Sequence, residues 1–184
     1  MQRSLRRWWY LAVQARQSLG KRRKDASFRL VPAIEAVIRV AGPSLDARVR
    51  ILCVGARNGI EPQLWRDRGY SAVEAIDIIP AKGVRLMDFH RLRHEDGAFG
   101  LVFASHAYEH ALDPGQAVAE AVRVLRPGGW LYAAFPVGFE TNAHDRWDYG
   151  DHRGFLRYLP AGTRLMDYRV WGGKTECNVL VRIA

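Results

Sequence analysis

Short apolar runs alternate with helix-like segments from residue 49 onward, and this alternation constrains the fold more than any other feature. The run "VRILCVG" ends in glycine, and "EPQLWRDRGY" follows with Pro62 at a first-turn position and Gly69 as a stop. Strands are predicted again at 71–78, 83–89, 100–105 and 130–136. Asp113 and Pro114 open a helix that "RPGG" closes. The pattern predicts an α/β fold with a doubly wound, mostly parallel sheet and helices on both faces.

The segments on either side of this alternation extend the prediction. Residues 27–43 place apolar side chains on one helical face before Gly42 and Pro43 stop the helix. Residues 151–160 read as a short helix. The β-rich runs 163–172 and 176–184, with "GGKT" between them, predict an antiparallel C-terminal hairpin at one edge of the sheet.

Charge is distributed unevenly along the chain. Residues 1–24 contain eight of the 28 basic residues and none of the 19 acidic ones, so the net charge of +9 belongs mainly to this segment. The remainder is nearly neutral and carries no specific nucleic-acid signal. Cys53 and Cys177 form no disulfide framework or zinc motif, which favours a cytoplasmic location.

The basic N-terminal arm, residues 1–24, is predicted to be an amphipathic helix preceding a single domain at 25–184. Its apolar side chains at helical spacing are Leu5, Trp8, Ala12, Ala15 and Leu19. Three roles fit this pattern: a peripheral contact with a membrane surface, an organelle import signal, or packing against its own domain or a protein partner. Packing is the commonest role of such a helix, so we favour it from sequence.

The loop after the first strand and the acid after the second predict a nucleotide-like ligand. Gly55 to Gly59 read "GARNG", where glycine permits close backbone approach and the next helix offers free N–H groups. Asp77 follows the second strand, where a carboxylate can accept hydrogen bonds from both ribose hydroxyls. The absence of G-x-G-x-x-G, with Arg57 at its second glycine, disfavours a nicotinamide dehydrogenase.

Five segments in this order and spacing resemble the motif series of class I S-adenosylmethionine-dependent methyltransferases, especially the type 11 group. They are "RILCVGARNGIEP", "AIDI", "LMDFHRL", "FGLVFASHAYEHALDP" and "AVRVLRPGGWLYAAFP", within about residues 49–136. The resemblance implies a Rossmann-like, seven-stranded sheet completed by the last two strands. It also implies an enzyme of class EC 2.1.1 that transfers a methyl group from S-adenosylmethionine to an unidentified O or N nucleophile.

The same resemblance assigns cofactor-binding residues. In the family the first loop wraps the methionine part, the acid after strand two holds the ribose, and the acid after strand three meets the adenine. The residues implied here are Gly55, Ala56, Arg57, Gly59, Asp77, Ile78, Asp88, Phe89 and Ser105.

Two positions depart from the family pattern. Cys53 stands where an acid is usual, and Arg57 stands where a glycine is usual. One hypothesis is that the Arg57 guanidinium pairs with the methionine carboxylate, which its planar fork suits. The alternative is a non-catalytic scaffold or partner-binding module that retains the fold with weak or lost cofactor binding.

The stretch "HAYEH" at 106–110 matches the zinc-peptidase pattern H-x-x-E-H, but a strand runs directly into its first histidine. We therefore predict no metal there, and the family resemblance implies that the segment lies beside the cofactor sulfonium. His106 is the first candidate for a catalytic base, followed by His110 and His144. In the loop after strand five, Asp145, Trp147 and Tyr149 are the candidate substrate-binding residues.

Overall fold

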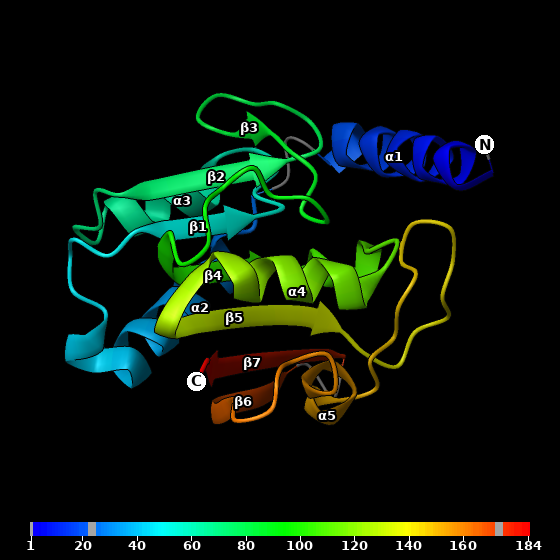
Figure 1. The fold of residues 1–184 in the computed structure, drawn as a ribbon. Helices are drawn as coiled ribbons and strands as arrows, with labels where there is room; N and C mark the ends of the chain where they lie inside the picture. The colour runs from blue at the N-terminus through cyan, green and yellow to red at the C-terminus, as the bar shows by residue number, and fades with distance from the viewer. Residues whose placement is uncertain (1, 22–24, 172–174) are drawn as a thin grey trace.

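A computed structural model of the protein describes residues 2–21, 25–171 and 175–184. A seven-stranded sheet with strand order β3-β2-β1-β4-β5-β7-β6 forms its centre, as Figure 1 shows. The strands are β1 (Ile51–Val54), β2 (Val73–Asp77), β3 (Arg85–Leu86), β4 (Phe99–Ser105), β5 (Leu125–Pro136), β6 (Arg164–Trp171) and β7 (Glu176–Arg182). β1 to β5 pair in parallel, whereas β7 is antiparallel to both β5 and β6. The doubly wound sheet and its C-terminal antiparallel pair are therefore confirmed.

Helices cover both faces of the sheet and bury it. α2 (Ser27–Ala41) and α3 (Ile60–Arg66) pack on one face, where Ile34 and Trp65 meet Phe103 and its neighbours. α4 (Pro114–Val124) and α5 (His152–Leu156) pack on the other, with Val118 and Phe155 in that core. Short 3-10 turns lie at η1 (Gly42–Ser44) and η2 (Tyr108–His110). Because both faces are covered, polar side chains gather at the ends of the strands.

The fifth and third strands differ most from their predicted boundaries. α4 ends at Val124 and β5 begins at Leu125, so "RPGG" lies within the strand instead of closing the helix. The third strand has only two residues, Arg85 and Leu86. It lies at the edge of the sheet and pairs with β2 on one side, so it has hydrogen bonds to a single neighbouring strand. The predicted start of α4 is confirmed, since the Asp113 carboxylate accepts a hydrogen bond from the Gln116 N–H.

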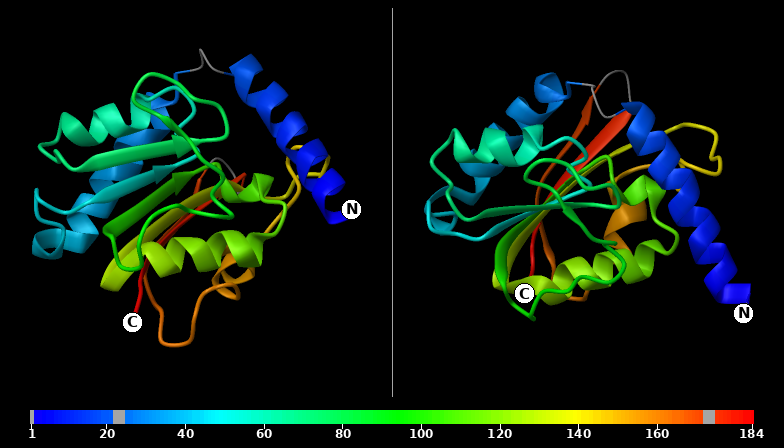
Figure 2. Two further views of the ribbon diagram at one scale, coloured as in Figure 1. Left: turned by 45° about the horizontal axis from the view of Figure 1, so that its top comes forward. Right: turned by 90° about the horizontal axis from the view of Figure 1, so that it is seen from above.

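The N-terminal helix α1 (Gln2–Lys21) lies beyond the ends of the parallel strands, on the side to which their arrowheads point (Figure 2). Its buried side chains are Tyr10 and Gln14, while Leu5, Trp8 and Leu19 are exposed. The helix thus contacts its own domain through Tyr10 and Gln14, while the predicted apolar side chains Leu5, Trp8 and Leu19 do not pack there. None of the helices in the described ranges is long and apolar enough to cross a bilayer.

Candidate functional site

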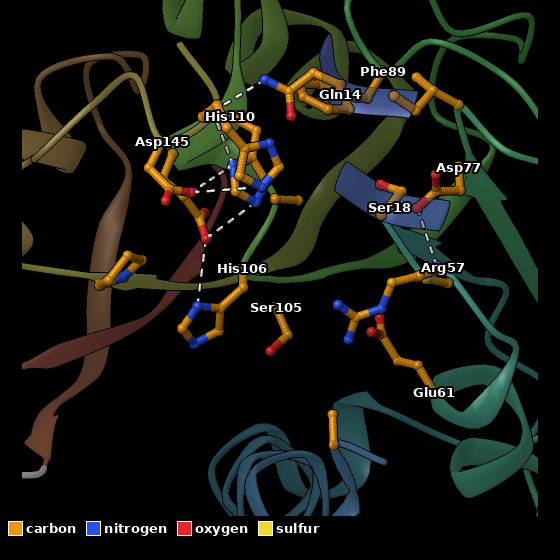
Figure 3. A pocket seen from close by; sticks show the side chains of 18 of the residues that line it. Gln14, Ser18, Arg57, Glu61, Asp77, Phe89, Ser105, His106, His110 and Asp145 are labelled. Carbon is orange, nitrogen blue, oxygen red and sulfur yellow. Dashed lines mark hydrogen bonds and ion pairs between the residues drawn. The ribbon is translucent and has the colours of Figure 1, made fainter. Parts of the chain in front are cut away.

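A cavity of about 680 Å³ opens at the carboxyl ends of β1, β2, β4 and β5. Its lining combines the loop after β1, the ends of β2 and β4, the loop after β5 and the inner face of α1. Figure 3 shows the polar side chains of these segments facing one space. Seven of the predicted cofactor residues line it: Gly55, Ala56, Arg57, Asp77, Ile78, Phe89 and Ser105.

The glycines of the first loop allow it to pack against neighbouring loops. Gly55 has φ of 74°, and a Cβ built there would lie 2.9 Å from the Ala107 Cβ. Gly59 has φ of 79°, and its Cβ would lie 2.8 Å from the Lys82 carbonyl oxygen. Gly59 itself lies outside the cavity lining. These glycines therefore shape the loop through close contact within the protein, which the sequence argument about ligand approach did not foresee.

Asp77 fixes the loop after β1 to the end of β2. Its Oδ2 accepts the Arg57 N–H at 3.1 Å, and its Oδ1 accepts the Ile79 N–H at 3.0 Å. Arg57 has φ of 40°, so a non-glycine residue occupies the left-handed region at this turn. Burial raises the pKa of Asp77, although the hydrogen bonds from Ile79 and Arg57 oppose that rise. The carboxylate is thus oriented at the cavity wall, as a ribose ligand requires.

The side chains of Arg57 and Glu61 both line the cavity and carry buried polar atoms without partners. Among the described residues, Arg57 Nε and Glu61 Oε1 have no hydrogen-bond partner. Glu61 lies in the first turn of α3 and hydrogen-bonds with the buried thiol of Cys53. Burial raises the pKa of Glu61 well above its ordinary range. A carboxylate on the adjacent helix therefore lies beside Cys53, which the sequence analysis missed.

Asp88, predicted to meet the adenine, has both carboxylate oxygens engaged within the protein. Its Oδ2 accepts from Arg7 Nη2 at 2.7 Å, and its Oδ1 lies 2.7 Å from His90 Nδ1. Asp88 lies outside the cavity lining, whereas Phe89 lines it and stacks on His90 with centroids 4.5 Å apart. The Arg7 contact comes from α1, and such a distant partner gives no local signal in the sequence.

His106 is held between two carboxylates at the end of β4. Its Nδ1 lies 3.3 Å from Glu109 Oε1, and its Nε2 lies 3.0 Å from Glu176 Oε2 and 2.9 Å from Arg29 Nη1. Burial lowers the pKa of His106, but hydrogen bonds to Glu109 and Glu176 outweigh it and raise the pKa to about 9. The raised pKa favours the protonated imidazole at neutral pH, a form that cannot accept a second proton, whereas the Arg29 guanidinium beside Nε2 opposes that protonation.

His110, His144 and Asp145 form a second polar cluster on the cavity wall. The two imidazole rings stack with centroids 4.1 Å apart, and Asp145 Oδ1 lies 3.1 Å from His110 Nδ1. The hydrogen bond from His110 lowers the pKa of Asp145 to about 2. The three residues offer ligand atoms within 4.8 Å of one another. Lone pairs in stacked rings lie in separate planes, however, so this arrangement fits a hydrogen-bonded cluster better than a metal site.

Two predicted substrate residues make contacts within the protein: Tyr149 is buried in the core, and Trp147 is partly buried against it. Trp147 donates from Nε1 to the Ala111 carbonyl oxygen at 2.8 Å, and Tyr149 donates to the Tyr108 carbonyl oxygen at 2.9 Å. Neither lines the cavity, whereas Asp145 does. The loop after β5 thus uses its aromatic side chains to attach itself to η2. An amphipathic ring suits either role, so residue type alone could not separate them.

Several cavity residues were not predicted from sequence. Tyr10 and Gln14 reach the site from α1, and Gln14 Nε2 donates to the His144 carbonyl oxygen at 3.0 Å. Arg29 lines the cavity from α2. Glu176 lies on β7 outside the cavity lining and contacts His106. Each lies far in sequence from the residue it contacts, so no short motif could have identified it.

Comparison with known proteins agrees with this architecture. Residues 52–133 match the family model of a methyltransferase domain. An uncharacterized 37.1 kDa protein in transposon TN4556 of Streptomyces fradiae is 47% identical over 81 residues, 44% of this chain and 23% of that protein. Malonyl-[acyl-carrier protein] O-methyltransferase of Serratia marcescens is 29% identical over 124 residues, 60% of this chain and 48% of that enzyme. The chain therefore spans less than half the length of either relative.

Solved structures share the fold at low identity. A 1,6-didemethyltoxoflavin-N1-methyltransferase of Burkholderia thailandensis superposes with a TM-score of 0.69 at 15% identity, covering 88% of this chain and 80% of that one. The [4+2]-cyclase SpnF superposes with a TM-score of 0.66 at 18% identity, covering 81% and 80%. The second match shows that this fold alone does not determine the reaction.

Proposed function

Because this chain belongs to the class I S-adenosylmethionine-dependent methyltransferases of the type 11 group, we propose that it transfers a methyl group to an O or N nucleophile. S-adenosylmethionine, bound at the cavity, would supply that methyl group from its sulfonium. The observation that carries the proposal is Asp77, fixed at the end of β2 by two backbone N–H groups and facing the same cavity as Arg57 and Glu61.

Asp77 would hold the ribose, and Arg57 and Glu61 would hold the two charged groups of the methionine part. A guanidinium complements a carboxylate, and a carboxylate complements an ammonium. The unpartnered Arg57 Nε and Glu61 Oε1 support this assignment, because buried polar atoms in proteins nearly always have partners. Glu61 on α3 would thereby replace the acid that relatives carry at the position of Cys53.

The acceptor group would be one that attacks without giving its proton to His106. The pKa of that imidazole is raised to about 9, which favours its protonated form at neutral pH, because Glu109 and Glu176 stabilise the imidazolium more than Arg29 opposes it. A carboxylate oxygen or a neutral amine needs no base before it attacks a sulfonium methyl, and alignment then supplies much of the rate. The charges of His106 and Arg29 are matched there by the carboxylates of Glu109 and Glu176, so this part of the cavity favours a neutral amine over an anionic acceptor.

Calorimetric titration with S-adenosylmethionine tests the cofactor site. We expect micromolar binding, about −8 kcal/mol, and a loss of at least about 100-fold in Asp77→Ala, since two hydrogen bonds to a charged group disappear. Asp67→Ala removes an exposed carboxylate on the far end of α3 and should bind like the native protein. Native protein that is folded by circular dichroism yet releases no heat would overturn the proposal and favour the non-catalytic scaffold.

The Arg57→Gly variant tests the contribution of the side chain at the altered loop position. Glycine relieves the left-handed backbone strain at φ of 40° and removes the guanidinium. Weaker binding by about tenfold supports the pairing with the methionine carboxylate. Tighter binding would show that Arg57 obstructs the cofactor.

A further inference from the structure

Helix α1 turns Arg7, Tyr10 and Gln14 toward the protein and leaves its largest apolar side chains exposed to solvent. On the inner face, Arg7 pairs with Asp88 at 2.7 Å and Gln14 donates to the His144 carbonyl oxygen at 3.0 Å. Tyr10, 1% exposed, packs edge-on against His90 with ring centroids 5.6 Å apart. These contacts fix which face of α1 points outward.

The outer face of α1 carries an apolar stripe. Leu5, Trp8 and Leu19 follow one another at helical spacing and are 61%, 73% and 56% exposed. Trp9 lies beside them at 56% exposure. In a surface helix of a soluble domain, the apolar stripe usually faces the core. The stripe of α1 faces solvent, and this orientation indicates that a partner covers it.

The charges beside the stripe identify the chemistry of that partner. Arg6 and Arg16 are exposed, and residues 1–24 contain no acidic residue. Tryptophan at the boundary of an apolar stripe and arginine beside it suit the headgroup region of a bilayer with anionic lipids. Two copies of α1 stacked on each other would instead bring like charges together, which disfavours a second copy as the partner.

We propose that α1 docks in the plane of an anionic lipid surface, with Leu5, Trp8, Trp9 and Leu19 in the headgroup region and Arg6 and Arg16 against lipid phosphates. This interaction goes beyond the proposed methyl transfer and does not depend on it. Because the inner face of α1 lines the cavity, docking places the cavity next to the lipid surface.

Co-sedimentation of the full chain with vesicles tests the proposal. We expect binding to vesicles of phosphatidylcholine mixed with phosphatidylglycerol, little binding to phosphatidylcholine alone, and weaker binding as salt concentration rises. The double variant Trp8→Ser, Trp9→Ser should lower the partition coefficient by about tenfold or more, because two large side chains no longer enter the interface. Arg6→Glu with Arg16→Glu should lower it by a similar factor of about ten.

Matched controls change residues of the same kind away from α1. Leu86→Ser with Met166→Ser removes two exposed apolar side chains, and Arg48→Glu with Arg93→Glu reverses two exposed charges. Both control proteins should bind vesicles like the native chain, and the altered residues of α1, being exposed, should leave the thermal midpoint unchanged. Equal binding to neutral and anionic vesicles, or equal losses in the controls, contradicts the proposal. A different outcome would assign the stripe to a second copy of the chain. In that case the native chain does not bind vesicles, and sedimentation velocity shows a dimer that the tryptophan substitutions dissociate.

Discussion

The two halves of the cavity are held together in different ways. At the ends of β1 and β2, a single carboxylate organises the loop through backbone N–H groups, and the partners lie 20 and 2 residues apart in sequence. At the end of β4, His106 is held by side chains from η2, α2 and β7, up to 77 residues away. The first half thus depends on local chain geometry, and the second depends on charges that meet only when the whole sheet is formed.

Among the substitutions that test this difference, Glu109→Ala should lower the free energy of unfolding the most. Its side chain is 2% exposed and contacts both His106 and His110. In Glu109→Ala the protonated His106 loses one of its two carboxylates, and breaking a buried pair in this way costs about 3–5 kcal/mol of unfolding free energy. Urea denaturation at pH 7 measures the loss. Glu95→Ala, which removes an exposed acid, should cost less than about 0.5 kcal/mol.

The stability of the second half should also depend on pH. The folded pKa of His106 is raised to about 9, above its ordinary 6.5, so its contribution is complete below about pH 6.5 and is lost as pH rises through 9. The shift corresponds to about 3 kcal/mol at most. Denaturation from pH 6 to pH 10 should therefore show a decline that His106→Gln removes. An unchanged decline in that variant would place the titrating group elsewhere.

A change in the first half should affect ligand affinity more than stability. Glu61→Gln keeps the shape of the side chain but cannot ionise opposite an ammonium group. We expect about tenfold weaker binding of S-adenosylmethionine by calorimetry, with little change in the thermal midpoint, because burial already favours the neutral acid in the free protein. A matched substitution, Glu74→Gln at the outer edge of β2, should leave affinity unchanged. Equal affinity in Glu61→Gln would remove Glu61 from the cofactor site.

The contact between α1 and Asp88 should have the smallest effect. Arg7 is 40% exposed, and a partly exposed ion pair contributes about 1 kcal/mol or less. Arg7→Ala should therefore lower the unfolding free energy by no more than that, as measured by urea denaturation. A larger loss would show that α1 is an integral part of the second half of the cavity.

The sequence predicted that the loop after β1 and Asp77 lie together, because the carboxyl ends of neighbouring parallel strands lie at the same edge of a sheet. The strand after "RILCVG" and the strand ending at Asp77 are parallel neighbours, so their following residues must meet at one edge. Glu61 was the local residue missed, although a missing acid at Cys53 and an acid in the next helix were both visible in the sequence. Neither position alone identifies Glu61; the pairing of Cys53 with an acid in the next helix does.

The second half could not be located in the same way. His106 was identified from its place after β4, but its role as a base was assigned without Glu176 and Arg29, whose proximity depends on the order of strands and helices in space. The orientation of α1 was also beyond reach, since the pattern of Leu5, Trp8 and Leu19 predicts an apolar face but not the direction in which that face points.

The position of β7 between β5 and β6 has a consequence for synthesis on the ribosome. β6 lies at the edge of the described sheet and hydrogen-bonds with β7, which follows it in the chain. While residues 176–182 remain in the exit tunnel, the nascent β6 has no strand to join, and the edge of β5 stays open. The parallel strands can assemble as they emerge, whereas His106 must wait for Glu176 to arrive with β7. The half of the cavity around His106 is therefore completed only after β7 has left the ribosome.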